Sequence, residues 1–199
     1  MNLRLTLAGA VATILASVAL YPLIATGTWF WQGIGVVVVV AAVGAVTRLR
    51  PLPAILCFPA TLAGAFLYLN ALFAPRQSLL RLIPTGPSVG HLARLVSQSS
   101  SEMSRYAPPV PGLAGLLLLT VAGIGLVAAI TDLLAVRLRK PALAGLPMLV
   151  LFCVPLTTDA KPPWVGTVLV FCAGVTGYLG LLSVEGRDRL RLWGRLVHS

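Results

Sequence analysis

WFWQGIGVVVVVAAVGAV, residues Trp29 to Val46, is a stretch of eighteen residues without a charged side chain. As a helix it would be ~27 Å long, close to the ~30 Å hydrocarbon core of a bilayer. Arg48 and Arg50 lie two and four residues after its end. The stretch therefore predicts a transmembrane helix whose basic end lies at one membrane surface.

Five further runs share this composition, and only the fourth of the six contains a charge. The predicted spans are residues 5–24, 29–46, 52–73, 110–136, 142–157 and 164–184. The fifth is the shortest and contains Pro147 and Pro155, so it must tilt little, thin the bilayer or rely on its neighbours. No convincing repeat relates the two halves. The sequence predicts an all-α, polytopic membrane helical bundle with six transmembrane helices, as a single membrane domain over residues 1–199.

Basic residues flank these runs on alternate sides. Ten of the fifteen lie on the side of both termini, including the tail at 185–199. By the positive-inside rule this side is cytoplasmic. Aromatic residues that suit the opposite, outer interface are Tyr21, Trp29, Trp31, Tyr106 and Trp164. We therefore expect a multi-pass protein of the plasma (cytoplasmic) membrane with its N-terminus and C-terminus both inside.

The overall composition excludes an ordinary soluble domain. The chain has 58% hydrophobic and 10% charged residues, a mean hydropathy of +0.94 and a net charge of +10, whereas soluble domains have about 25% charged residues. Topology and contact with anionic lipid at the inner face explain the positive charge, so no nucleic-acid partner is expected. The first run is long and lacks a clear cleavage site, which favours a retained helix over a signal peptide.

Residues that could carry chemistry are scarce. Cys57, Cys153 and Cys172 lie inside predicted spans without C-x-x-C spacing, and we interpret them as small buried hydrophobes. His91 and His198 are isolated from each other and from any acid at metal-ligand spacing. We expect no metal site, no cofactor and no catalytic group.

The predicted external loop at 74–109 contains an amphipathic segment. Pro87 and Ser88 are suited to begin a helix. Apolar residues then recur near helical spacing at Val89, Leu92, Leu95, Val96 and Met103. This pattern predicts an interfacial helix. The serine run 99–101 has no acid and histidine arranged around it and is interpreted as a solvated turn.

Asp132 is the charge in the fourth span, five residues before Arg137. A carboxylate there needs a partner, and Arg48, Arg50 or Arg139 could reach it from the inner interface. The structural hypothesis is an ion pair that ties a helix end to a neighbouring segment. The functional alternative is a relay for protons or cations, but no second intramembrane polar group is evident in the sequence.

Several separated motifs occur in a recognisable order: LIPTGPS (82–88), RYAPPVP (105–111), TDLLAVR (131–137), PALAGLP (141–147) and EGRDRLRLWG (185–194). Together they resemble the N-terminal membrane region of actinobacterial TgpA-like proteins of the cell envelope. In that family a multi-span segment precedes an extracytoplasmic, transglutaminase-like cysteine protease domain of papain type. The resemblance covers nearly the whole chain.

The resemblance implies a membrane anchor or scaffold that positions an enzyme domain in cis or in trans. The family's catalytic Cys, His and Asp belong to the later domain and match no residue here. It also implies a MoxR-type AAA ATPase as a candidate cytoplasmic partner. A domain encoded after residue 199 would require a seventh span to reach the outside.

Two other classes of function compete with an anchor. A small polytopic transporter would use Asp132, although transporters place polar groups near mid-membrane on interrupted helices. An intramembrane enzyme would need paired polar residues within the spans, and these are not evident. The sequence favours the anchor.

Overall fold

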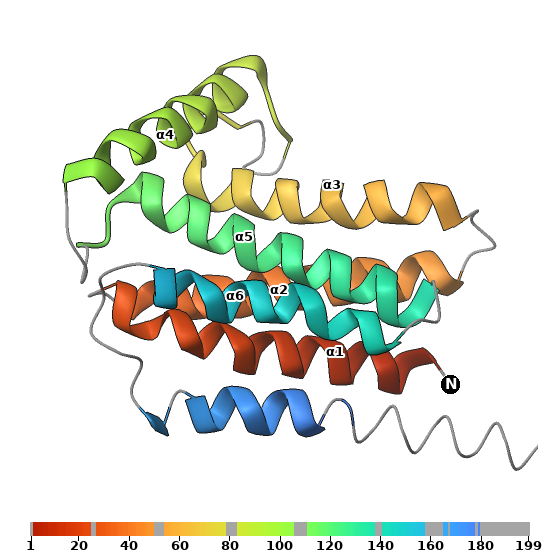
Figure 1. Cartoon of the computed structure of the whole chain (residues 1–199). Coiled ribbons are helices and arrows are strands. Elements are labelled where there is room, and N and C mark those ends of the chain that lie inside the picture. Colours follow the sequence, from red (N-terminus) through yellow and green to blue (C-terminus); the bar gives the residue numbers. More distant parts are fainter. Residues whose placement is uncertain are drawn as a thin grey trace, which may run out of the picture.

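The structure is a computed structural model that describes residues 2–24, 27–49, 54–78, 83–105, 111–137, 141–157, 165–166, 168–177 and 179. This part of the chain is helical apart from short connections (Figure 1). The α-helices are α1 (Asn2–Ser17), α2 (Thr28–Leu49), α3 (Ala54–Phe73), α4 (Gly86–Arg105), α5 (Ala114–Asp132) and α6 (Gly145–Thr157). A further apolar helix covers Val168–Gly177. The all-α prediction is confirmed.

Within the described residues, three helices are long and apolar enough to cross a membrane: Thr28–Leu49, Leu56–Phe73 and Ala114–Ala135. At 1.5 Å per residue they are about 27–33 Å long. The shorter apolar helices are Thr6–Tyr21, Gly145–Val154 and Val168–Gly177. Six apolar helices thus coincide with the six predicted runs, while their lengths identify only three as candidate spans. Together they indicate a membrane protein.

Short helical segments of other types adjust the helix ends. The 3-10 helix η1 (Val18–Leu23) continues α1 and contains Pro22, which cannot donate a backbone hydrogen bond. A π-helix, η2 (Leu133–Arg137), continues α5. The 3-10 helix η3 (Pro141–Ala144) precedes α6, whose Pro147 falls in the first turn, where a missing N–H is tolerated. Pro59 lies inside α3.

Helix α5 is the centre of the bundle, because it contacts α1, α2, α3, α4 and α6. Reciprocal glycines bring α2 and α5 close together. A Cβ on Gly33 of α2 would lie 3.0 Å from Ile124 of α5, and one on Gly125 of α5 would lie 2.8 Å from Val36 of α2. Each glycine thus receives a branched side chain of the other helix, which is how helices associate in lipid without a hydrophobic driving force.

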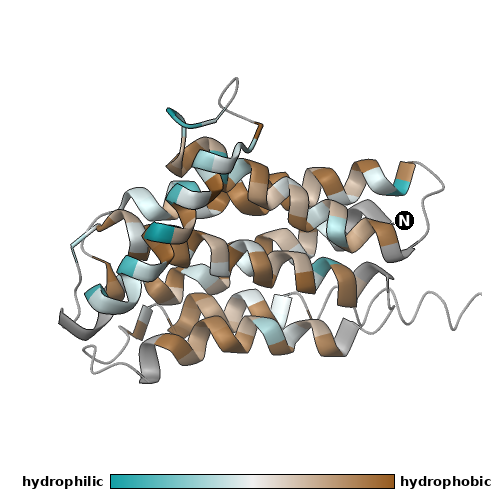
Figure 2. Ribbon diagram, turned by 90° about the horizontal axis from the view of Figure 1, so that it is seen from above, coloured by the Kyte–Doolittle hydropathy of each residue, from teal (hydrophilic) through white to brown (hydrophobic). Residues whose placement is uncertain are grey.

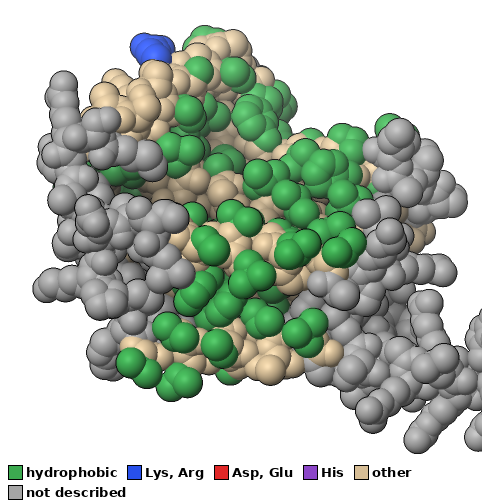
Figure 3. Space-filling view, viewed as in Figure 1, with side chains coloured by type: hydrophobic (Ala, Val, Ile, Leu, Met, Phe, Trp, Pro, Cys, Tyr) green, Lys and Arg blue, Asp and Glu red, His purple; other side chains and the backbone are tan. Residues whose placement is uncertain are grey.

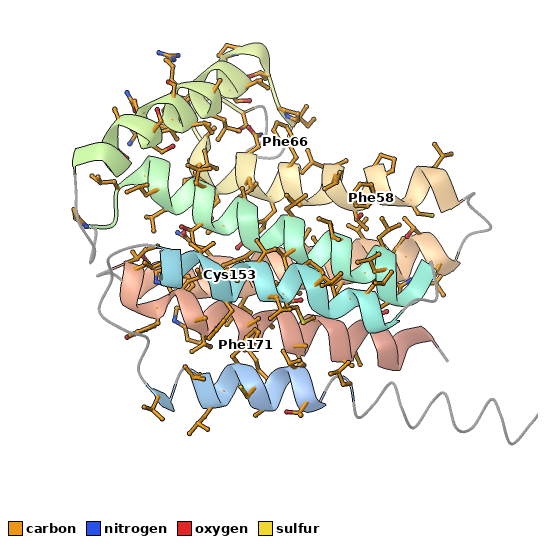
Figure 4. The ribbon with its side chains drawn as sticks, in the orientation of Figure 1. Phe58, Phe66, Cys153 and Phe171 are labelled. Atoms are coloured by element: carbon orange, nitrogen blue, oxygen red, sulfur yellow. The ribbon has the colours of Figure 1, made fainter. Side chains whose placement is uncertain are left out.

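The last apolar helix packs beside α1 and α6. Phe171, labelled in Figure 4, lies on the side of this helix that faces the bundle. It stacks on Phe152 of α6 with ring centroids 4.7 Å apart. A Cβ on Gly174 would lie 2.9 Å from Leu15 of α1.

Cys57 is buried, but Cys153 and Cys172 are exposed, so the interpretation of all three as buried residues is wrong for the latter two. None of the three forms a disulfide bond within the described residues.

The outer surface of the bundle is apolar. Figure 2 shows hydrophobic residues along most of the length of the long helices, and Figure 3 shows hydrophobic side chains spread over one face. Exposed examples are Val38 and Val46 on α2, Leu126 on α5, and Val150 on α6. A surface of this kind is suited to lipid tails rather than water.

Candidate functional site

Arg48 and Asp132 form an ion pair between α2 and α5. Arg48 lies in the last turn of α2, and its Nη2 donates to Asp132 Oδ1. Its Nη1 donates to the hydroxyl of Thr6 on α1. One guanidinium therefore joins three helices, and Asp132 is only 8% exposed. Arg50 and Arg139, the other two arginines considered as partners, lie outside the described residues.

The backbone around the pair leaves room for it. Gly44 lies one helical turn before Arg48, and a Cβ there would be 3.0 Å from both Arg48 Nη2 and Asp132 Oδ2. On the α5 side, Asp132 is the last α-helical residue before the π-helix η2. The N–H of Leu133 reaches the carbonyls of both Ala129 and Ile130. The π-helical turns of η2 are wider than α-helical turns, and turns of this type are often found at functional sites.

Three threonines surround the pair. Thr6 and Thr13 are seven residues apart on α1 and share a face, and Thr131 precedes Asp132 on α5. Each is buried. The Thr13 hydroxyl donates to Gly9 O at 2.8 Å. The expectation that no second polar group lies near Asp132 inside the bundle is therefore wrong.

A small cavity lies between these helices. It is lined by Thr6 and Thr13 of α1, Val37 and Val40 of α2, and Thr131 and Asp132 of α5. Sequence reasoning missed the threonines because single hydroxyl residues are common in apolar helices. The available signal was the i, i+7 spacing of Thr6 and Thr13 on α1.

A second polar contact lies near the opposite end of α2. Tyr68 of α3 donates its hydroxyl to Gln32 O at 3.3 Å. Trp29 is 0% exposed and packs against Tyr21 and Phe30, so its ring is enclosed by the bundle and is not free to contact lipid head groups as an aromatic anchor would. Tyr21 and Trp31, at 62% and 74% exposed, fit the expected exposed position. Tyr106 and Trp164 lie outside the described residues.

Helix α4 begins where the sequence suggested, with a reciprocal cap. Thr85 N donates to Ser88 Oγ at 2.9 Å, and Ser88 N donates to Thr85 Oγ1 at 3.4 Å. This is the geometry of a capping box with serine as its second member. The interpretation of residues 99–101 as a turn is wrong. Their hydroxyls donate to the carbonyls of Val96, Ser97 and Gln98 inside α4.

Helix α4 rests on α5 and α3 with one face. Ser88, Leu92 and Ser99 are buried, and a Cβ on Gly115 of α5 would lie 2.7 Å from Leu95 O. Val89 and Val96, which the sequence grouped with Leu92 and Leu95, are instead exposed. The apolar residues of α4 thus form two groups. One group packs on the bundle, and the other, Val89 and Val96, is an exposed strip that we call the free shoulder.

The described residues contain no group of three potential metal ligands among His, Cys, Asp and Glu. His91 lies on α4, partly buried. His198 and the tail 185–199 lie outside the described residues. The arrangement of Arg48, Asp132 and the threonines can hold three helices in register, and the expectation of a chain without metal, cofactor or catalytic group remains untested.

The fold defines a class of helical protein with apolar, membrane-compatible helices and an ion pair within the bundle. Residues 11–198 match the family model of the TgpA N-terminal domain, and the chain belongs to that family. No curated protein and no solved structure matches the chain. The match confirms the resemblance drawn from the five sequence motifs.

Proposed function

We propose that this chain is a non-catalytic membrane anchor that positions an extracytoplasmic transglutaminase-like enzyme domain. The observation that carries the proposal is the family match, which includes nearly all of the described helices. The matched family is an N-terminal domain and not a catalytic one. The surface chemistry agrees, because exposed apolar side chains are spread over the helices.

The proposed topology has six spans with both termini in the cytoplasm. Six apolar helices and the alternating basic residues support it. Helix α4, which joins the ends of α3 and α5, would then lie outside at the membrane interface. Its free shoulder of Val89 and Val96 suits the boundary between head groups and acyl chains. Basic segments at the inner ends would contact anionic lipid.

Photo-crosslinking in cells that express the gene tests the anchor. A benzophenone amino acid replaces Val96 on the exposed shoulder of α4, or, as a control, Leu49 at the opposite end of the bundle. We expect the variant labelled at position 96 to yield crosslinked peptides from a transglutaminase-like domain, in the same polypeptide or in another. The variant labelled at position 49 should not. Crosslinks to that domain from Leu49 alone would place the enzyme on the wrong side and overturn the proposal.

The purified chain should also lack enzymatic activity of its own. We expect no hydrolysis of a labelled casein and no incorporation of a fluorescent amine into casein. Activity that is abolished by replacing Cys57, Cys153 or Cys172 would contradict the anchor, because these are the chain's only thiols.

A MoxR-type AAA ATPase is the proposed cytoplasmic partner, on the basis of the family resemblance.

A small polytopic transporter that uses Asp132 remains the competing proposal. The ion pair with Arg48 weighs against it, because a carboxylate neutralised by arginine is a poor ligand for a passing cation. Proton or cation flux in proteoliposomes that Asp132→Asn abolishes would favour the transporter.

A further inference from the structure

The cavity beside the ion pair has the size and lining of a site for a single small molecule. Its volume is about 10 Å³, close to the 10–15 Å³ that one buried water needs on the same measure. Val37 and Val40 are among its apolar lining residues, and Thr6, Thr13, Thr131 and Asp132 are its polar ones. A dry cavity is apolar on all sides, and this one is not.

Two side-chain oxygens of these polar lining residues have no hydrogen-bond partner among the described residues. Among the described residues, neither Asp132 Oδ2 nor Thr131 Oγ1 has a hydrogen bond, and both atoms are buried. Thr131 is 1% exposed. Arg48 occupies only the other carboxylate oxygen, Asp132 Oδ1. Burial of an unpaired carboxylate oxygen is unfavourable, so a donor of hydrogen bonds is required here.

We propose that this cavity binds one ordered water molecule, which hydrogen-bonds to Asp132 Oδ2 and Thr131 Oγ1. The water donates one hydrogen bond to Asp132 Oδ2 and accepts one from the Thr131 hydroxyl. Its second proton is directed to Thr13 Oγ1, which already donates to Gly9 O and can still accept. These are the two to four polar partners that buried waters have.

Charge argues for water rather than a metal cation as the occupant. Arg48 and Asp132 together are neutral, so a sodium ion would leave a net positive charge inside the bundle. It would also face the guanidinium across a short distance in a medium of low dielectric constant. A neutral ligand that both donates and accepts avoids these costs.

Water-edited solid-state NMR of the threonine-labelled full chain in lipid bilayers tests the site. Thr47 is the matched control, because it is buried near the same end of α2, does not line the cavity, and donates to Gly44 O at 3.0 Å. We expect magnetisation from water to reach Thr131 several-fold faster than Thr47. Equal rates for the two threonines would overturn the proposal.

Two substitutions at Ala128, a buried residue that lines the cavity, separate a hydrated site from an empty one. Ala128→Val fills the space with methyl groups and displaces the water, so that Asp132 Oδ2 is left without a hydrogen-bond donor. Ala128→Ser fills it with a hydroxyl that can replace the water. We expect the valine variant to melt at least about 4 °C below the serine variant, and to lose the fast transfer to Thr131. A valine variant that melts at or above the serine variant would indicate an empty cavity and overturn the proposal.

The remaining alternative is a cation. The melting temperature is compared in sodium chloride and in choline chloride at equal ionic strength, and we expect no difference. A saturable rise with sodium would identify an ion in place of water and overturn the proposal. If Ala128→Val does not fold, the NMR comparison and the salt comparison on the unmodified chain still decide the question.

Discussion

Asp132 is tolerated inside an apolar bundle because the guanidinium of Arg48 lies beside it, and Thr6 accepts a hydrogen bond from the same guanidinium. An isolated carboxylate near the centre of a membrane helix costs about 2.5–3.5 kcal/mol on insertion scales. Pairing with arginine offsets this cost without making the pair a source of stability in itself, because two charges have left water. Loss of one partner should therefore be far more damaging than loss of both.

Asp132→Asn should destabilise the purified chain by about 3–5 kcal/mol, because it leaves Arg48 as an uncompensated buried charge. Arg48→Gln should have a similar effect. Thermal melts of the two single variants and the double variant form a cycle, and the double variant should cost less than the sum. The exposed Arg94→Gln is the control and should change nothing. Additive single effects would show that the two side chains act independently.

Gly44→Ala should weaken the same pair through sterics alone. The new methyl group would lie 3.0 Å from Asp132 Oδ2 and from Arg48 Nη2, tighter than ordinary contact. We expect a loss of about 1–3 kcal/mol, as for overpacking elsewhere. Gly123→Ala on α5 meets nothing within 4 Å and should be neutral or stabilising, since alanine is the better helix former. Equal melting temperatures for the two variants would argue against a tight fit at Gly44.

At the scale of elements, α4 depends on one close approach to α5. Gly115 is the residue that allows it, because a Cβ there would meet the backbone carbonyl oxygen of Leu95 at 2.7 Å. A backbone atom cannot rotate away as a side chain can. The contact therefore sets how closely the two helices lie at this end of the bundle.

Gly115→Ala should lift α4 from the bundle while leaving the other helices in place. Hydrogen exchange of α4 amides should accelerate, because opening α4 would cost less free energy. The control is Gly90→Ala on α4 itself, which meets nothing within 4 Å and should leave exchange unchanged or slower. Unchanged exchange in Gly115→Ala would mean that α4 is held mainly by other contacts.

The sequence predicted helices well because apolar composition alone decides them in lipid. It predicted the side-chain contacts between helices poorly. Arg48 could be named only as one of three candidates for Asp132, since the choice depends on how α2 and α5 are rotated against each other. Trp29 shows the same limit: a tryptophan near a helix end suits the interface in sequence, yet the packing of Tyr21 and Phe30 encloses it. The threonine-lined cavity arises from three helices and has no counterpart in any single run.

For the whole molecule, the proposed orientation is directly testable. In a background without Cys57, Cys153 and Cys172, a cysteine at the exposed Ser100 of α4 should react with an impermeant maleimide in intact cells. A cysteine at Ser199 should react only after permeabilisation. The opposite pattern would reverse the topology and the proposed function with it.

The ion pair also has a meaning for how the protein is made. Arg48 and Asp132 are 84 residues apart, so at about 5–20 residues per second the ribosome needs roughly 4–17 s to deliver the second charge after the first. During that interval Asp132 is not yet available, and we expect the guanidinium to stay at the water boundary. We therefore expect the ion pair to form late in biogenesis, only after the central helix α5 has been inserted.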